Sequence, residues 1–316
     1  MPFNSILEYV EGPGGLGWTL YPVQRFILKL YYGLELDDTQ RTIIIPDMFQ
    51  EHTRYTLTEQ EYLSYLFGEG RCSVPDTSTI PRNNLVLAMG RRTGKTTLAS
   101  FIASYTIIQL LQLMNPHEIF ESMTPRQRLY VVGISPNSDL RSNLLYDVQD
   151  CVYRCQDLQS AAVSYGIQGN VTFLTYAGRQ LGLTNGNLVF SSLTARPRHS
   201  SGRRAMLIID ELAHMEHEQG MYDANLPTII SPGHYVLMST PNRASGAFYM
   251  AFIHAMQSAG HVDSPLALQI PTWEVQQALG SGYLRDNYNR EPSRFLVEFG
   301  AVWRDTRRVV TINVTI

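Results

Sequence analysis

The sequence is poor in cysteine, in excess charge of either sign and in long apolar runs. Its three cysteines, Cys72, Cys151 and Cys155, are too few for a disulfide framework or a zinc site. The net charge of −3 and the pI of about 6.2 exclude a globally basic nucleic-acid-binding protein. No apolar run approaches the roughly 18 residues of a membrane-spanning helix, and the N-terminus lacks the features of a signal peptide. We therefore expect a protein of a reducing compartment that does not cross a membrane.

From residue 85 onward, short apolar runs alternate with segments of helical periodicity. This alternation predicts an α/β fold with a mostly parallel sheet and helices on both faces. In such sheets, ligands bind beyond the carboxyl ends of the strands, and Gly90, Ser135, Asp210 and Thr240 each follow a predicted strand. We predict strands at residues 85–89, 129–134, 171–176, 188–192, 205–209, 235–239 and 266–270, and helices at residues 95–114, 140–159 and 248–258.

Residues 85–97 read LVLAMGRRTGKTT, which is typical of a strand, a phosphate-binding loop and the start of a helix. The usual GxxxxGK[ST] pattern requires glycine at position 89, but this chain has Met89 there and continues with Gly90. Backbone N–H groups of such a loop surround the phosphates, Lys95 reaches the β- and γ-phosphates, and Thr96 offers a hydroxyl to Mg²⁺. The predicted nucleotide-binding residues of the loop are Gly90, Arg92, Thr93, Gly94, Lys95, Thr96 and Thr97.

Two adjacent carboxylates, Asp210 and Glu211, follow the apolar run at residues 206–209. Asp210 is placed to hold Mg²⁺ together with Thr96, and Glu211 is placed to act as the general base for an attacking water. The loop and the carboxylates together predict a nucleoside-triphosphate hydrolase. The alternative is a degenerate loop that binds nucleotide without hydrolysis, and the second carboxylate argues against it.

The order of the motifs GRRTGKTT, ISPN, IIDE and STPN resembles the ATPase domain of the large terminase subunit of tailed bacteriophages. The resemblance runs from about Tyr21 to Trp303. It implies a P-loop NTPase core of the ASCE, RecA-like type at residues 84–303, preceded by an adapter at residues 1–83. Residues 304–316 would begin a linker to a nuclease domain, which we expect to be absent. The implied cofactors are ATP and Mg²⁺.

The same resemblance implies roles for individual residues around the loop. Arg91 would contact the γ-phosphate in cis and join Lys95 and Glu211 in catalysis; the alternative is an arginine that only solvates the loop. Tyr21 and Gln24 would recognise adenine, because an amide can both donate to and accept from the base edge; the alternative is an ordinary helix start. The resemblance also implies a coupling segment that senses the state of the γ-phosphate and transmits it, made of Ser239, Thr240 and Pro241. The alternative is an ordinary turn at the end of a strand.

Several basic residues precede the carboxylate strand, namely Arg196, Arg198, His199, Arg203 and Arg204. The resemblance implies that one of three of them, Arg198, Arg203 or Arg204, reaches the ATP of a neighbouring subunit. Contact with DNA phosphates and a solvated basic loop are the alternatives.

Two histidines, His214 and His217, follow the carboxylates. The string DELAH is one residue longer than the helicase motif DEAH, so we interpret both histidines as surface or packing residues rather than metal ligands.

The function implied is an ATP-driven motor that translocates double-stranded viral DNA into a procapsid. Its implied partners are double-stranded DNA, the portal protein, the small terminase subunit and further copies of itself in a ring, with no membrane contact. The implied location is the host cytoplasm, at the procapsid portal. A helicase-like ATPase fragment acting on nucleic acid is the main alternative, although too few residues follow Gly260 for the second nucleotide-binding domain of a helicase. An inert structural ring component and a small-molecule kinase are the weaker alternatives.

Overall fold

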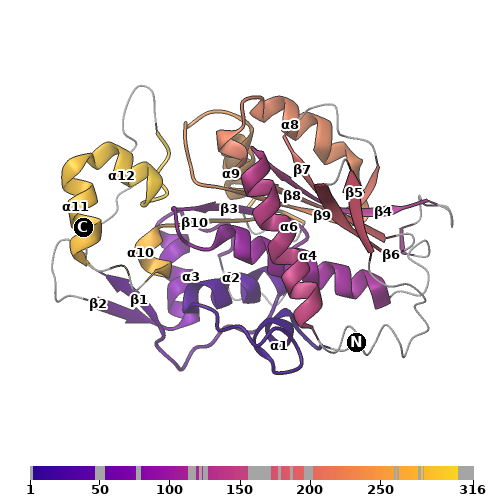
Figure 1. Ribbon diagram of the computed structural model, residues 1–316. Coiled ribbons are helices and arrows are strands. Elements are labelled where there is room, and N and C mark those ends of the chain that lie inside the picture. Colours follow the sequence, from indigo (N-terminus) through magenta and orange to yellow (C-terminus); the bar gives the residue numbers. More distant parts are fainter. Residues whose placement is uncertain are drawn as a thin grey trace. The chain divides into compact units, whose positions relative to one another are not determined.

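In the computed structural model, the chain forms two compact units. Figure 1 labels their helices and strands. The first unit contains Met1–Thr19 and Thr96–Val236, and the second contains Leu20–Lys95 and Leu237–Ile316. The expected adapter at residues 1–83 is thereby shared between both units. The structure describes residues 3–46, 54–75, 80–112, 119–120, 123, 127–155, 172–176, 179–185, 188–195, 202–259, 261, 263–276, 279 and 281–304.

Each unit combines strands with helices. The elements of the first unit are α1 (Ile6–Glu11), α4 (Lys95–Gln112, from its second residue), β4 (Leu129–Ser135), α6 (Ser138–Arg154), β5 (Thr172–Tyr176), β6 (Arg179–Asn185), β7 (Leu188–Thr194), β8 (Arg203–Asp210), the short 3-10 helices η1 (Leu212–His214) and η2 (Leu226–Thr228), α8 (Glu218–Asn225) and most of β9 (Ile229–Ser239). Those of the second are α2 (Pro22–Tyr32), β1 (Ile43–Pro46), β2 (Arg54–Leu57), α3 (Glu59–Gly68), β3 (Leu85–Met89), the end of β9, α9 (Ala247–Gln257), β10 (Leu266–Ile270), α10 (Thr272–Val275), α11 (Ser281–Arg290) and α12 (Pro292–Glu298).

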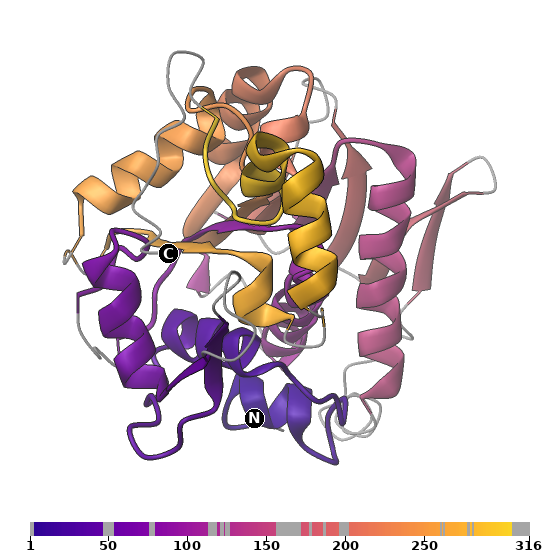
Figure 2. The same cartoon turned by 90° about the vertical axis from the view of Figure 1, so that its left-hand side faces the viewer.

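The main sheet confirms the predicted α/β fold. Its strand order is β10-β3-β9 in the second unit and β9-β8-β4-β7-β6-β5 in the first, because β9 contributes residues to both. β3 pairs in parallel with β10, and β4 pairs in parallel with both β7 and β8. In the second unit, α9 lies on one side of β3 and β10 and α2 lies on the other (Figures 1 and 2). No helix among the residues with a described placement is long and apolar enough to cross a membrane.

The strands that position the candidate site are largely buried and contain apolar runs. All five residues of β3 and all five of β10 are buried, and seven of the eight residues of β8 are buried. Continuous apolar runs of this length are typical of parallel strands that are covered on both faces. The polar residues that follow each run mark the ends of the strands.

Helix starts in the second unit follow from local side-chain chemistry. α3 begins after Thr58, whose hydroxyl accepts a hydrogen bond from the N–H of Glu61 at 3.1 Å. The Glu61 carboxylate accepts in return from the N–H of Thr58 at 3.0 Å, which completes a capping box. α2 has Pro22 in its first turn and ends at Gly33 in the left-handed conformation, as the capping preferences of proline and glycine predict.

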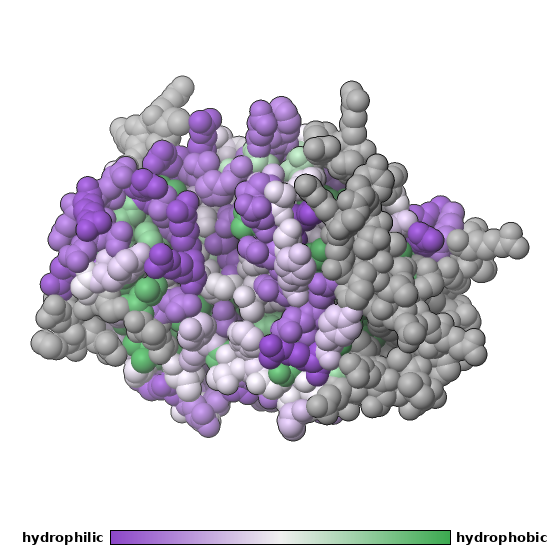
Figure 3. Space-filling view, in the orientation of Figure 1, coloured by the Kyte–Doolittle hydropathy of each residue, from purple (hydrophilic) through white to green (hydrophobic). Residues whose placement is uncertain are grey.

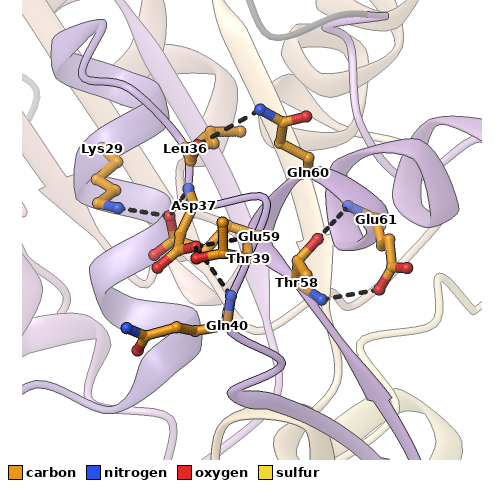
Figure 4. A network of polar contacts seen from close by, with 9 residues as sticks. All are labelled: Lys29, Leu36, Asp37, Thr39, Gln40, Thr58, Glu59, Gln60 and Glu61. Carbon is orange, nitrogen blue, oxygen red and sulfur yellow. Dashed lines mark hydrogen bonds and ion pairs between the residues drawn. The ribbon is translucent and has the colours of Figure 1, made fainter.

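A polar network joins α2 to the start of α3 (Figure 4). The Glu59 carboxylate accepts from the Lys29 ammonium at 2.6 Å and from the N–H of Asp37 at 2.7 Å. The Asp37 carboxylate accepts from the N–H groups of Gln40 and Thr39, and these hydrogen bonds lower its pKa to about 2. The segment between α2 and β1 is therefore held by its own Asp37 and by Glu59 of α3.

Residues 71–73 run beside β10 in the second unit. The N–H of Ser73 donates to the carbonyl of Ala267 at 3.0 Å, and the N–H of Ala267 donates to the Ser73 hydroxyl at 2.8 Å. The N–H of Gln269 donates to the carbonyl of Arg71 at 2.8 Å. Residues 71–73, which precede β3 in the sequence, thus occupy hydrogen-bonding groups of β10.

Some predicted element bounds are wrong. β8 begins at Arg203, so Arg203 and Arg204 belong to the strand rather than to a loop before it. β6 was not predicted, and it pairs antiparallel with β5 and β7. α11 and α12 were not predicted either, because their sequences are largely polar.

Candidate nucleotide-binding site

The predicted phosphate-binding loop begins at Gly90, and the structure explains why the glycine stands there. Met89 is still part of β3, opposite Ile270 of β10, and is fully buried. A Cβ atom on Gly90 would lie 2.3 Å from the hydroxyl of Thr272 and 2.4 Å from the carbonyl oxygen of Phe299. Both approaches are closer than a side chain allows, so the glycine is required one position later than in the usual pattern.

Within the loop, the Thr93 hydroxyl donates to the carbonyl of Gly90 at 2.8 Å, and this hydrogen bond stabilises the turn. Arg92 and Gly94 both have positive φ, at 62° and 78°. A non-glycine residue in this left-handed region is uncommon and is often associated with a functional loop. These turns curve the backbone between β3 and α4.

The ammonium of Lys95 is buried within the second unit. Its Nζ donates to the hydroxyl of Thr240 at 2.9 Å and to the carbonyl of Gly90 at 3.2 Å, with the carbonyl of Met89 at 3.4 Å. Lysine carries three hydrogen-bond donors and no acceptor, so these three oxygens match the donors of the ammonium. The contact brings together two residues that the sequence assigned to binding and to coupling.

In the first unit, the predicted Mg²⁺ ligands lie together. The hydroxyl of Thr96, in the first turn of α4, donates to Oδ2 of Asp210 at 3.0 Å. Asp210 ends β8 and is fully buried. A hydroxyl and a carboxylate are oxygen ligands of the kind that Mg²⁺ prefers, so this pair fits the metal that the sequence predicts. Thr97 follows in the same helix and is partly buried.

Glu211 follows directly after β8 with φ of 54° and ψ of 43°, in the left-handed region. Such a conformation is unfavourable for a residue with a side chain, and it redirects the chain from β8 into η1. Nε2 of His214 lies 3.9 Å from Oε2 of Glu211. His214 is exposed, in agreement with its interpretation as a surface residue, and its imidazole adjoins the predicted general base.

Gln24 contacts the loop directly, within the second unit. Its Nε2 donates to the carbonyl of Thr93 at 3.0 Å, and its Oε1 accepts from the N–H of Tyr21 at 3.2 Å. Gln24 is buried, whereas Tyr21, the residue before α2, is exposed. Each amide atom retains the capacity for one further hydrogen bond. Adenine recognition by Gln24 stays a prediction, whereas its hydrogen bond to the carbonyl of Thr93 in the loop is observed.

Both loop arginines contact the C-terminal helices of the second unit. Nη1 of Arg91 lies 3.5 Å from Oε2 of Glu298, at the end of α12. The guanidinium of Arg92 lies over the ring of Tyr283 in α11, 5.5 Å from the ring centroid. At this separation a cation attracts the face of an aromatic ring.

The three candidates for an arginine acting in trans occupy different positions. Arg204 is buried in β8, and its Nη1 donates to Oδ1 of Asn225 at 2.8 Å. Burial lowers the pKa of Arg204 to about 10. This environment favours a structural role for Arg204. Arg203 is partly exposed at the start of the same strand, and Arg198 lies outside the described residues.

The coupling candidates lie at the end of β9. Ser239 and Thr240 are buried, and Pro241 follows them. The Ser239 hydroxyl donates to the carbonyl of Thr240 at 2.8 Å, and the Thr240 hydroxyl accepts from Lys95. The predicted coupling residues are therefore linked to Lys95, which is predicted to bind phosphate.

No family model matches the sequence, and no curated protein is significantly similar to it. Solved structures do show a likeness. The chain is similar to phage large terminases. A mutant ATPase domain of the large terminase of Thermus phage P74-26 is 17% identical with a TM-score of 0.47, over 71% of this chain and 90% of that domain. The large terminase of bacteriophage HK97 is 13% identical with a TM-score of 0.47, over 69% of this chain and 46% of its own length. The large terminase of another thermophilic bacteriophage is 14% identical with a TM-score of 0.42, over 70% and 48% of the two chains.

Three further residues lie near the predicted site, beyond those predicted to bind nucleotide or metal. Thr272 donates through its hydroxyl to the carbonyl of Arg91 at 2.8 Å, and Glu298 adjoins the Arg91 side chain. The buried hydroxyl of Ser135 has no hydrogen-bond partner among the residues that the structure describes. Because Ile134 pairs with Ile209, Ser135 ends β4 at the level of Asp210. Only Ser135 had a sequence indication, as a polar residue after a predicted strand.

Proposed function

We propose that this chain is the ATP-hydrolysing motor domain of a phage-type large terminase and drives translocation of double-stranded DNA. The observation that carries the proposal is the hydrogen bond between Thr96 and Asp210. These residues are 114 positions apart in the sequence, yet the loop hydroxyl and the strand-end carboxylate meet at 3.0 Å. A P-loop NTPase requires this juxtaposition, because the same two residue types hold Mg²⁺ in that class.

The chemistry assigned to the protein groups is positioning and charge stabilisation. Lys95 would bind the β- and γ-phosphate oxygens, and Arg91 would stabilise charge that spreads over the transferring phosphoryl group. Thr96 and Asp210 would hold Mg²⁺, which supplies positive charge at the phosphates. Glu211 would accept a proton from the attacking water as its oxygen bonds to the γ-phosphorus. The bond from that phosphorus to the oxygen of ADP then breaks, giving ADP and phosphate.

Coupling would begin at the Lys95–Thr240 contact. A phosphate that binds Lys95 competes with the Thr240 hydroxyl for the ammonium donors. The hydrogen bond between Ser239 and the carbonyl of Thr240 provides a local connection from that hydroxyl to the end of β9. We therefore assign Ser239, Thr240 and Pro241 to the segment that senses whether phosphate is present.

The proposed partners are double-stranded DNA, a portal protein, a small terminase subunit and further copies of this chain in a ring. The proposed place of action is the host cytoplasm, at the procapsid portal. Arg203 and Arg198 are the preferred candidates for an arginine that reaches a neighbouring subunit, because Arg204 is buried within its own chain.

The test is steady-state ATP hydrolysis by the parent, Glu211→Gln and Arg91→Ala over a range of protein concentrations, with and without linear double-stranded DNA. Glu216→Gln is the matched control, since it removes an exposed carboxylate from the same region. We expect Glu211→Gln to bind ATP. Its kcat should fall by a factor of about 10²–10⁴, the usual contribution of a general base. The control should match the parent.

A rise in specific activity with protein concentration would support an arginine acting in trans. A parent that binds no nucleotide would refute the proposal as a whole. A parent that hydrolyses ATP without any response to DNA would refute the motor function and leave an ATPase of another kind.

A further inference from the structure

The Arg91 backbone is fixed while its side chain is half exposed. The N–H of Arg91 donates to the carbonyl of Glu298 at 2.7 Å, and the carbonyl of Arg91 accepts from the Thr272 hydroxyl at 2.8 Å. The Arg91 side chain is 53% exposed, and its Nη1 lies 3.5 Å from Oε2 of Glu298, which is 19% exposed. The guanidinium can therefore turn away from Glu298 without any movement of the loop.

The Glu298 carboxylate, by contrast, is held where it is. Nε of Arg294 donates to its Oε1 at 2.9 Å, one helical turn earlier in α12. The residues on either side of this turn, Phe295 and Phe299, pack with Trp273 in a buried cluster. The rings of Trp273 and Phe295 are stacked with centroids 5.9 Å apart. Glu298 keeps a cationic partner if Arg91 leaves.

We propose that Glu298 is a positioning residue that holds Arg91 away from the nucleotide and thereby sets the affinity for the terminal phosphate. The inference rests on the proposed function, in which Arg91 reaches that phosphate. A carboxylate and a phosphate are alternative partners for one guanidinium, so the two anions compete. On ATP binding, Arg91 exchanges Glu298 for the phosphate, and Arg294 retains Glu298.

The contact of Arg92 with Tyr283 supports the same assignment. Both loop arginines are engaged by the pair of helices α11 and α12 rather than by the loop itself. The outer surface over these helices is mainly hydrophilic (Figure 3). Their contribution to the site is thus made by the few side chains that face the loop.

The test compares Glu298→Gln with Glu291→Gln, which changes an exposed acid at the start of α12 that approaches Arg294. Dissociation constants are measured for a non-hydrolysable ATP analogue and for ADP, both with Mg²⁺. A partly exposed ion pair of this kind corresponds to roughly a two- to fivefold change in binding. We expect Glu298→Gln to tighten the ATP analogue by that factor, with a smaller change for ADP. Glu291→Gln should match the parent.

Glu298→Asp and the Arg91→Ala background separate positioning from folding. Aspartate restores the charge and should return the affinity toward that of the parent. In the Arg91→Ala background, Glu298→Gln should no longer alter ATP binding, whereas a purely structural effect would persist and overturn the inference. Parent-like binding by Glu298→Gln would also overturn it while leaving the proposed function intact. A parent that binds no ATP would instead refute the proposed function itself.

Discussion

Replacement of Glu274 by glutamine tests the most deeply buried ion pair described in the second unit. Arg71 donates to the Glu274 carboxylate through Nη1 at 2.9 Å and through Nη2 at 2.7 Å. The Tyr62 hydroxyl donates to the same carboxylate at 2.5 Å. The Glu274 side chain is 2% exposed and that of Arg71 is 10% exposed. Glu274 lies in α10, two residues after Thr272, which holds the carbonyl of Arg91.

The expected loss of stability is about 3 kcal/mol or more. Removal of one partner from a buried pair typically costs about 3–5 kcal/mol, because the other charge is left buried and uncompensated. Glutamine retains one acceptor oxygen, so we place the value near the lower end of that range. With an unfolding entropy of about 2.1 cal/mol/K per residue, the Tm of a chain of 316 residues shifts by roughly 1.5 °C per kcal/mol, which predicts a fall of roughly 4–5 °C.

The assay is urea and thermal unfolding followed by circular dichroism, with Asp286→Asn as a control at an exposed acid. The double variant Arg71→Met with Glu274→Leu removes both charges and should recover at least half of the loss, since no unpaired ion remains. A cost below about 1 kcal/mol for Glu274→Gln would refute the reasoning, because Arg71 would then not depend on this carboxylate.

Three further predictions concern the buried Gln24, the partly buried His234 and two buried cysteines. Gln24→Ala should lower the free energy of unfolding in urea by about 1–3 kcal/mol, because the carbonyl of Thr93 loses its donor. Burial lowers the pKa of His234 to about 4, below the unfolded value of about 6.5. The unfolded chain therefore binds the proton first as the pH falls, and stability should decline between pH 6.5 and 4 by up to about 3 kcal/mol, a decline that His234→Gln should remove. Burial raises the pKa of Cys151 to about 11 and that of Cys72 to about 12, so a thiol reagent at pH 8 should label neither until the protein unfolds.

Much of the sheet could be predicted from the sequence because its strands are continuous apolar runs. The predicted bounds of β3 and β10 agree with the structure. β6, with the sequence RQLGLTN, carries too few apolar residues to be separated from a loop. Its strand character depends on pairing with β7 rather than on its own pattern.

The candidate site was predicted residue by residue, but not its supporting contacts. Charge and hydroxyl chemistry identified Lys95, Thr96 and Asp210, and the structure brings Thr96 to Asp210. The carboxylate beside Arg91 comes from Glu298 in α12, which is distant from Arg91 in the sequence. A single ion pair of this kind leaves no periodic or compositional pattern, so only the fold reveals it.

Residues 71–73 have a further consequence for how the chain can be shortened. An uncovered parallel strand at the end of a sheet presents free N–H and C=O groups to other chains, and β10 is shielded from such pairing by its hydrogen bonds to Arg71 and Ser73. A fragment that starts at residue 84 would keep every predicted catalytic residue and lose this cover. We therefore expect self-association of that fragment, so the minimal well-behaved fragment extends upstream of the loop that begins at Gly90.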